Sequence, residues 1–429
     1  MSQSNLSSRE VETLEALSKF PLLQALAGRR SRRFCLGATI PDGPLLFKSR
    51  HKPMPLTELE QLIVLTSMAG ITGWNFGITR HARYAPRFPN YNGSAVGRML
   101  PSAAGFHTSE LFFTDDKGTY IFPTRDGQPS LDIRNGEVDL EEFLSVHRSR
   151  IRRLSDKRVY LPRTEPYLEG HNTWIANHEG STLVFPVGDI AQHNLANICF
   201  YVQNGFYLYD DIARKQIPGI EKFRNLVDMD KTIPLSSCEQ YSLTECTSEL
   251  ASSCFAGVLM LQAMGLGGWM FDGIDRLTML GASGDPEVPG LGFRSDKNER
   301  WAIPNPTGLA GVFEGYCPPH YRDMRAAVEA LAKRKFGPGG PYNSGTPGPW
   351  LETAKVRGSA QPFTEEFKEC VALQAQYAYD TYGKFPATVP TIFIMMYVQA
   401  QHIDLEFYDY HFKSGAYLRT HEEHMKRWH

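Results

Sequence analysis

A long stretch without a single charged side chain, residues 250–271, constrains this chain more than any other feature. It follows a Ser-x-x-Glu pattern at Ser242 and Glu245, which is typical of a capping box at a helix start, and no proline interrupts it before Gly265. Glycine at that position is typical of a helix end. Apolar residues fall on nearly every side of such a helix, so we predict a long central helix buried all round.

A membrane-spanning helix is the alternative interpretation of this stretch by length. Ser252, Ser253, Gln262 and several glycines interrupt it, however, and no basic flank follows it. We therefore favour a core helix followed by a flexible Gly-Leu-Gly-Gly-Trp turn. The net charge of −2 gives no reason to expect nucleic acid or an anionic membrane as a partner.

Composition indicates a packed protein in a reducing compartment. The 429 residues are 42% hydrophobic and 12% aromatic, which excludes a disordered chain. The seven cysteines form no C-x-x-C pair and no pairing with histidine at zinc spacing. The opening MSQSNLSSREVE has no apolar run typical of a signal peptide. We expect a cytoplasmic protein.

We expect a main domain over residues 1–334, with an irregular insertion around 124–185. A Gly- and Pro-rich stretch, 335–350, opens a C-terminal extension over 335–429, which we expect to be helical and to wrap the domain or act as a lid. Periodicity and turn signals predict local elements as follows: helices over 10–26, 55–70 and 324–335, an exposed helix face at 148–158, a hairpin within 111–122, and strands within 196–203 and 205–211.

Basic residues gather in the segment Arg29-Arg30-Ser31-Arg32-Arg33-Phe34. Guanidinium groups with a hydroxyl match the oxygens of a phosphate, so the segment could cradle an anion. It could equally be a solvated surface, which the pattern favours when taken alone.

Three separated patches together point to a family. They are the arginine-rich segment 29–34, the turn Pro-Ser-Ala-Ala-Gly at 101–105, and Ala-Met-Gly-Leu-Gly-Gly-Trp at 263–269. In order and spacing they resemble the FMN-dependent nitroreductase-like superfamily, and within it the SagB-type (azoline-oxidase-like) branch. The resemblance implies an α+β fold, with a central mainly antiparallel sheet, flanking helices and a long buried central helix. It also implies a homodimer with FMN between the subunits.

The resemblance implies a set of cofactor-binding residues, and their chemistry suits FMN. The phosphate requires cations and a hydroxyl, and the flavin ring requires close backbone contact. The implied contacts are Arg29, Arg30, Ser31 and Arg33 for the phosphate, with Arg294 as a further phosphate ligand, Pro101, Ser102, Ala103, Ala104 and Gly105 against the flavin, and Gly267, Gly268 and Trp269 beside the ring.

His107 is the candidate catalytic residue, together with a tyrosine of the 84–91 loop. Its alternative role is that of a turn histidine whose hydrogen bonds are satisfied locally. Many nitroreductases carry Asn-x-Gln where this chain has Gly105-Phe-His107, and azoline oxidases are associated with a Lys-Tyr pair that this chain lacks. The resemblance therefore implies the cofactor more strongly than the substrate.

The expected function is transfer of hydride or electrons between a small organic or peptide-derived substrate and an acceptor such as O₂ or a nicotinamide cofactor, NAD(P)H. The alternative is a flavin-binding or flavin-remodelling protein, or a non-catalytic partner subunit, on the same fold.

A metal site is not expected. The pattern His402-Ile-Asp404-Leu-Glu406 contains metal-binding residue types. On a helix, however, spacing by two residues scatters side chains around the axis, so these three would not converge on one ion.

Overall fold

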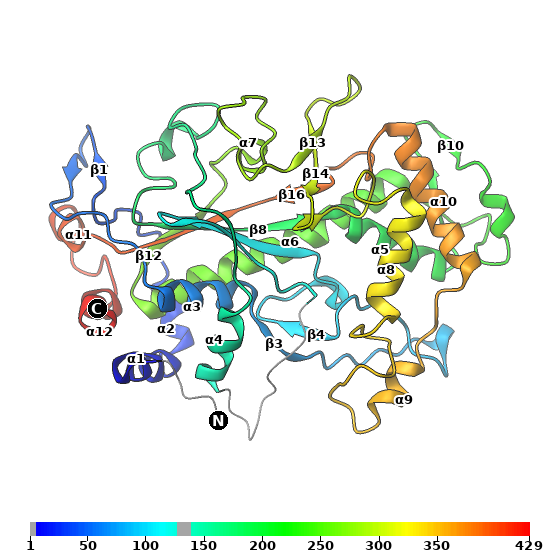
Figure 1. The fold of residues 1–429 in the computed structure, drawn as a ribbon, viewed down its shortest axis with the longest axis horizontal. Helices are drawn as coiled ribbons and strands as arrows, with labels where there is room; N and C mark the ends of the chain where they lie inside the picture. The colour runs from blue at the N-terminus through cyan, green and yellow to red at the C-terminus, as the bar shows by residue number, and fades with distance from the viewer. Residues whose placement is uncertain (1–5, 127–138) are drawn as a thin grey trace.

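A seven-stranded sheet, in which every pair of neighbouring strands is antiparallel, forms the centre of the molecule (Figure 1). The computed structural model describes residues 6–126 and 139–429. The strand order is β12 (Gly267–Phe271), β17 (Tyr397–Gln401), β8 (Thr182–Asp189), β5 (Ser109–Asp115), β6 (Gly118–Phe122) and β7 (Arg152–Ser155), with β16 (Ile392–Ile394) also paired to β8. The prediction of an α+β fold around a mainly antiparallel sheet is confirmed.

Side chains on both faces of this sheet are buried, as the alternation along its strands requires. In β5, Phe112 enters one hydrophobic cluster, whereas its neighbours Leu111 and Phe113 enter another. The second cluster is closed by α3 (Glu58–Ala69) and α6 (Leu235–Met264). The predicted hairpin is β5–β6, and the predicted helix at 55–70 is α3, which begins at a capping box of Thr57 and Glu60.

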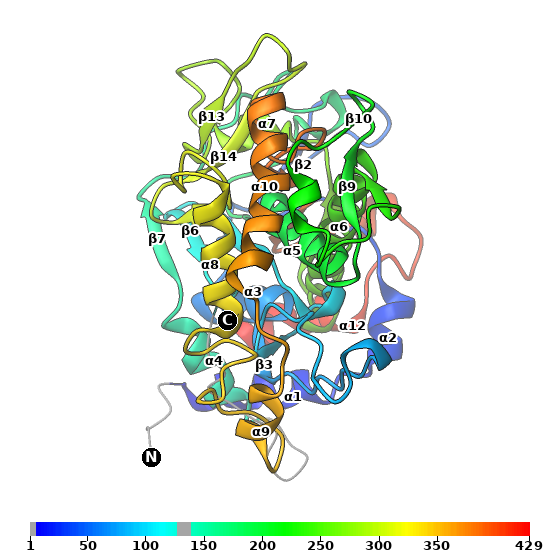
Figure 2. The same cartoon turned by 90° about the vertical axis from the view of Figure 1, so that its right-hand side faces the viewer.

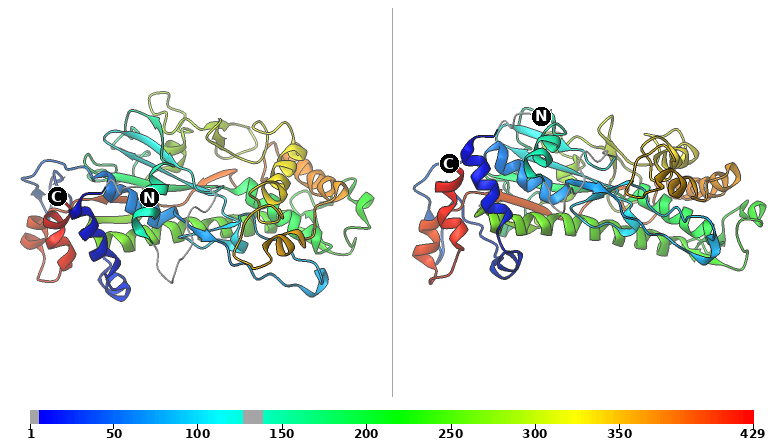
Figure 3. Two further views of the ribbon diagram at one scale, coloured as in Figure 1. Left: turned by 60° about the horizontal axis from the view of Figure 1, so that its bottom comes forward. Right: turned by 90° about the horizontal axis from the view of Figure 1, so that it is seen from below.

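Helix α6 runs along the length of the molecule beneath the sheet (Figure 3). It begins at Leu235, so the predicted start at Ser242 is wrong. Ser242 and Glu245 do not cap the helix because both reach neighbouring α5 (Ile190–Gln203): the Ser242 hydroxyl lies 2.9 Å from Asn194 Oδ1, and Glu245 contacts His193. The predicted end is confirmed, since Gly265 adopts a left-handed conformation with φ of 81°.

One side of α6 is open to solvent in the single chain, contrary to the prediction of burial all round. Tyr241 is 51% exposed and Phe255 is 41% exposed, and Thr244 and Ser248 lie exposed on the same side. The long apolar sequence thus includes one face that the chain itself leaves uncovered. Among the described residues, no helix combines the length and apolar character needed to cross a membrane.

A second hydrophobic core lies between α5 (Ile190–Gln203), α8 (Met324–Phe336) and α10 (Glu365–Tyr382), which Figure 2 shows side by side. The strand predicted within 196–203 is wrong, because these residues belong to α5. The buried residues of α5, such as Leu195, Ile198 and Val202, recur at helical spacing. The strand prediction arose from the aromatic and β-branched residues of this stretch, which also favour strands.

The C-terminal part of the chain contributes to the centre of the fold. Residues 392–401, which we expected to be helical, form β16 and β17, and β17 lies between β12 and β8. The final helix, α12 (Arg419–Trp428), packs against the end of α6 and against α1 (Ser8–Ser18). The domain division at residue 335 stays a prediction.

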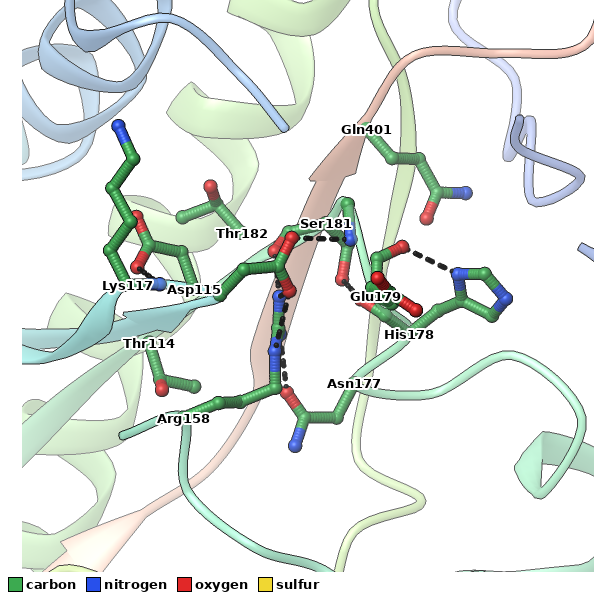
Figure 4. A network of polar contacts seen from close by, with 12 residues as sticks. Thr114, Asp115, Lys117, Arg158, Asn177, His178, Glu179, Ser181, Thr182 and Gln401 are labelled. Carbon is green, nitrogen blue, oxygen red and sulfur yellow. Dashed lines mark hydrogen bonds and ion pairs between the residues drawn. The ribbon is translucent and has the colours of Figure 1, made fainter. Parts of the chain in front are cut away.

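The prediction that residues 148–158 form a single exposed helix face is wrong. Helix α4 (Leu140–Arg148) ends there and strand β7 follows. Arg158 is half-buried and binds Asp116 at 2.6 Å and Asn177 at 2.8 Å, which holds the β5–β6 turn to the segment before β8 (Figure 4). Tertiary partners on both sides of this arginine, which local sequence does not reveal, decide its position.

The remaining elements are short or peripheral. They are α2 (Leu22–Gly28), β1 (Thr39–Ile40), β2 (Phe47–Lys48), β3 (Ile71–Trp74), β4 (Val96–Arg98), β9 (Tyr207–Asp210), β10 (Lys215–Gln216), β11 (Thr232–Pro234), α7 (Arg276–Leu280), β13 (Arg294–Asp296), β14 (Asn305–Leu309), β15 (Phe313–Glu314), α9 (Thr353–Gly358) and α11 (Leu405–His411), with 3-10 turns at Ala82–Tyr84, Ala103–Gly105, Gly170–Asn172 and Ile220–Phe223.

Candidate functional site

Two of the three sequence patches lie side by side. The arginine-rich segment runs along the outer edge of β12, where the Gly268 N–H donates to the Arg32 carbonyl at 2.9 Å. Strand β12 follows the end of α6 after a two-residue turn. The chain therefore brings residues 29–33 and 267–269 to one end of α6.

Arg32 has a structural role in this segment. Its guanidinium is buried and donates to Gln262 Oε1 at 2.6 Å and to the Ala416 carbonyl at 3.0 Å. Burial lowers the pKa of Arg32 to about 10, which still leaves the group charged at neutral pH. Arg32 thus ties the segment to α6.

The neighbouring side chains lie where an anion can reach them, although Arg30 Nη1 also donates to the carbonyl oxygens of Ala27 and Arg29. Arg29, Arg30 and Ser31 are exposed. The guanidinium of Arg33 lies 5.0 Å from the centre of the Trp269 ring and donates to Asn172 Oδ1 at 2.7 Å, but its Nε has no hydrogen-bond partner among the described residues. Of the predicted phosphate ligands in this segment, three are exposed, and the fourth, Arg33, has one hydrogen-bond donor without a partner among the described residues.

The glycines of β12 allow other parts of the same chain, rather than a ligand, to approach closely. A Cβ on Gly267 would lie 1.9 Å from Ile403 Cγ2, and one on Gly268 would lie 2.1 Å from the Gln399 carbonyl oxygen. Gly268 also has φ of 149°, a conformation that side chains rarely adopt. These contacts explain both glycines without a ligand, and their contact with a flavin stays a prediction.

The turn at 101–105 lies elsewhere along α6. Ser102 donates to Glu249 Oε2 at 2.7 Å, and Ala103–Gly105 form a short 3-10 turn beside the helix. Glu249 precedes Gly265 by roughly 24 Å of helix, at about 1.5 Å per residue. One chain therefore does not bring this turn to the arginine-rich segment.

His107 follows this turn and is buried. Its backbone N–H donates to Ser102 Oγ at 3.0 Å, and its Nδ1 has no partner in the described part of the chain. Burial lowers the pKa of His107 to about 3, against the opposing effect of Glu249, so the ring is neutral at physiological pH. Its catalytic role stays a prediction.

A cavity of about 230 Å³ opens next to the turn, with Ala103 in its wall. Aromatic side chains and polar groups converge on it. The lining residues are Asn90, Tyr91, Ala103, Phe106, His193, Ala196, Asn197, Cys199, Phe200, Gln203, Tyr241, Glu245 and Lys335. Tyr91 belongs to the loop in which we expected a functional tyrosine.

Two ionisable features of this cavity were missed by the sequence reasoning. His193 Nε2 lies 2.8 Å from Glu245 Oε2, which also accepts from Asn197 at 2.9 Å. Lys335 is buried, and burial lowers its pKa to about 8. Correct assignment of α5 as a helix would have put His193 and Asn197 on one face, but no local signal brings them to Glu245 or Lys335.

Arg294 is separate from the other predicted ligands. It lies in β13, above the sheet in Figure 1, whereas the arginine-rich segment follows α2 below it. Its exposed guanidinium pairs with Asp296 at 3.1 Å.

The expectation about residues 402–406 rested on a helix that does not extend that far. Residues 402–404 lie between β17 and α11, and Glu406 lies in the first turn of α11. His402 meets Glu60, His424 and His429, whereas Asp404 and Glu406 lie near exposed His51.

Comparisons with known proteins give little further information. No protein-family model matches the chain, and no curated protein matches it. Among solved structures, it is similar to one described as a putative nitroreductase from Ralstonia eutropha JMP134, at 12% identity over 60% of this chain and 72% of that chain, with a TM-score of 0.28. A likeness this distant carries no argument about this chain.

Replacing Gly268 by alanine tests the close packing of β12. The new methyl group would collide with the Gln399 backbone, so we expect a loss of about 1–3 kcal/mol in the free energy of unfolding, measured with urea. Gly43→Ala is the matched control, because Gly43 also has a positive φ but no described atom lies within 4 Å of its Cβ position. Equal losses in both variants would contradict the packing role.

Replacing Lys335 by methionine tests its lowered pKa. Between about 8 and the usual value of 10.5 the unfolded chain binds more protons than the folded one, so stability rises with pH in this window. Lys335→Met should remove that rise, which amounts to up to about 3 kcal/mol. The measurement is urea unfolding from pH 7 to 10.5, with exposed Lys333→Met on the same helix as control. Identical pH profiles in the two variants would refute the shift.

Proposed function

We propose that the chain is an FMN-dependent oxidoreductase of nitroreductase type that works as a homodimer. The observation that carries this proposal is the arrangement of two half-sites at opposite ends of α6. A basic edge lies at its C-terminal end, and an aromatic cavity lies beside its N-terminal half. Each half-site suits one end of an FMN molecule.

The basic edge suits the phosphate. A dianionic phosphate is best held by several charge-assisted hydrogen bonds. Arg29, Arg30 and Ser31 are exposed there, and the buried, unsatisfied Nε of half-buried Arg33 is a donor that a further oxygen would satisfy. This unsatisfied donor is the feature that a merely solvated surface leaves unexplained.

The cavity suits a flat aromatic ring. Tyr91, Phe106, Phe200 and Tyr241 supply apolar and aromatic surface, and Lys335 supplies a buried donor. Ligand sites commonly combine such a lining with a few convergent polar groups. Ala103 brings the predicted flavin turn to this wall.

A two-fold dimer would bring the two half-sites together. Glu245 and Gly265 are equidistant in sequence from Phe255, so an antiparallel pair of α6 helices crossing at Phe255 would bring the cavity of one subunit level with the basic edge of its partner. Two-fold symmetry then makes two equivalent sites. The exposed ring of Phe255, together with Leu22 and Leu23 of neighbouring α2, supplies apolar surface for this contact.

Bound FMN would supply hydride transfer. Around it, the chain would anchor the phosphate, exclude water from the ring, and hold a proton at the Lys335 ammonium or on the His193–Glu245 pair. The substrate class we propose is a small organic or peptide-derived molecule, with NAD(P)H or O₂ as the other electron carrier. We also propose a cytoplasmic setting, which suits the seven cysteines, all of them buried and unpaired.

The deciding experiment is mass spectrometry of the small molecules released when the purified protein is denatured, together with its visible spectrum. We expect FMN and a flavin spectrum that NADH or NADPH bleaches. Protein that is colourless and does not bind added FMN would overturn the proposal. Bound FMN that no electron donor reduces would instead favour a flavin-binding or partner protein.

Replacing Arg29 or Arg30 by glutamine should weaken FMN binding. Each charge-assisted bond to the phosphate contributes about 1.5–3 kcal/mol, so the dissociation constant should rise at least about tenfold per variant. Flavin fluorescence titration measures it. Arg322→Gln is the control, because Arg322 is exposed and pairs only locally with Asp323. Unchanged binding in both test variants would leave the segment as a solvated surface.

Replacing Phe255 by glutamate should separate the subunits and abolish FMN binding together, because the site would be shared. Analytical ultracentrifugation gives the mass, and the titration above gives binding. Exposed Phe76, which lies in the β3–β4 connection and does not line the cavity, serves as the control in Phe76→Glu.

Mixing two defective variants tests the shared site directly. Arg29→Gln/Arg30→Gln damages the basic edge, and Ala196→Trp fills the cavity. After unfolding and refolding together, half of the dimers combine both chains and hold one intact site of two, so about a quarter of wild-type FMN binding should return. A mixture that binds no better than its parents would place both halves of the site within one chain.

A further inference from the structure

Four side chains of the types that bind metals converge near the C-terminal end of α6. They are Glu60, in the first turn of α3, His402, directly after β17, His424, in α12, and His429, directly after α12. Helix α12 lies against α1 at this end of the molecule (Figures 1 and 3). Three segments far apart in the sequence thus contribute to one cluster.

The cluster is compact and buried. Glu60 Oε1 lies 3.1 Å from His402 Nε2, 2.8 Å from His424 Nε2 and 3.3 Å from His429 Nε2. The Nε2 atoms of His402 and His429 are 3.2 Å apart. Glu60, His402 and His424 are at most 4% exposed.

Hydrogen bonds behind the cluster fix which nitrogen of two rings carries the proton. His402 Nδ1 lies 2.9 Å from the Met54 carbonyl oxygen, and His424 Nδ1 lies 2.8 Å from the Met264 carbonyl oxygen. A carbonyl only accepts, so both Nδ1 atoms are protonated. In the neutral rings, each Nε2 therefore points a lone pair at the Glu60 carboxylate.

Lone pairs facing a carboxylate repel it unless a cation lies between them. Protonating all three rings would put three positive charges beside one negative charge in a buried space, which is costly. His424 Nε2, moreover, makes no hydrogen bond within the described residues despite its 2.8 Å distance from Glu60. The arrangement is that of metal ligands whose outer nitrogens are held by carbonyl groups.

The spacing of the ligand atoms identifies the kind of ion. Tetrahedral zinc has ligands at roughly 2.0–2.1 Å, which puts neighbouring ligand atoms roughly 3.3 Å apart. Four of the six separations in this cluster lie between 2.8 and 3.3 Å. Imidazole nitrogens also favour zinc and its first-row neighbours over magnesium or calcium.

We propose that Glu60, His402, His424 and His429 bind one divalent transition-metal ion, with Zn²⁺ as the expected occupant. Four protein ligands in a buried position make this a closed structural site. The ion would fasten α12 to α3 and to the end of α6. It does not depend on the proposed flavin, since none of its ligands lines the cavity or belongs to the basic edge.

Elemental analysis of the whole protein, purified without a histidine tag from zinc-supplemented medium, tests the proposal. We expect one zinc ion per chain. Glu60→Gln should lose the zinc ion. If the cluster bound no metal, this substitution would leave the fold intact, and the new amide would donate a hydrogen bond to a histidine nitrogen. His421→Ala is the matched control, because His421 is equally buried on α12 but lies outside the cluster.

A second measurement needs no variant. After chelator treatment, the wild-type protein should bind Co²⁺ with the visible absorption of tetrahedral coordination, and Zn²⁺ should displace it. Absence of metal from the purified protein, together with no cobalt spectrum, would overturn the site. FMN content, measured on the same samples, reports separately on the proposed function.

Discussion

The fold depends on buried polar side chains spaced along α6. Each holds a separate part of the chain to the helix. Glu239 accepts from the backbone of Ala387, at 2.6 Å, and of Thr388; Glu249 accepts from Ser102 and Ser109; and Gln262 accepts from Arg32. Losing one partner would leave a buried polar group unsatisfied, which costs about 1–3 kcal/mol. These contacts therefore fix the loops relative to a single rigid element, and both proposed half-sites inherit their positions from it.

Local patterns were enough to predict the elements whose cause is local. The capping box of Thr57 and Glu60 and the glycine end of α6 are confirmed, because each depends on residues within one turn. Ser242 and Glu245 have the same pattern as the first pair, yet lie inside α6. Their partners come from α5, and the sequence contains no sign of that contact.

The candidate sites were harder to predict for the same reason. The arginine-rich segment and the β12 glycines were identified from their residue types, and the chain does bring them together. The glycines, however, are explained by the close approach of Ile403 and Gln399, which lie more than a hundred residues away. The four-residue metal cluster was missed because its members come from separated segments, and because residues 402–404 were taken as helical.

The end of α6 links the two proposed sites physically. Gly265 has no room for a side chain, since its Cβ position lies 2.1 Å from the Thr420 carbonyl oxygen. That approach lets α12 pack directly on the helix end, where the Met264 carbonyl oxygen meets His424 Nδ1. The next strand, β12, holds the backbone of Arg32. An ion bound at His424 would therefore restrain the same helix end that carries the basic edge. A structural metal would then influence phosphate binding by fixing the position of that edge, without any contact between the metal ion and the phosphate.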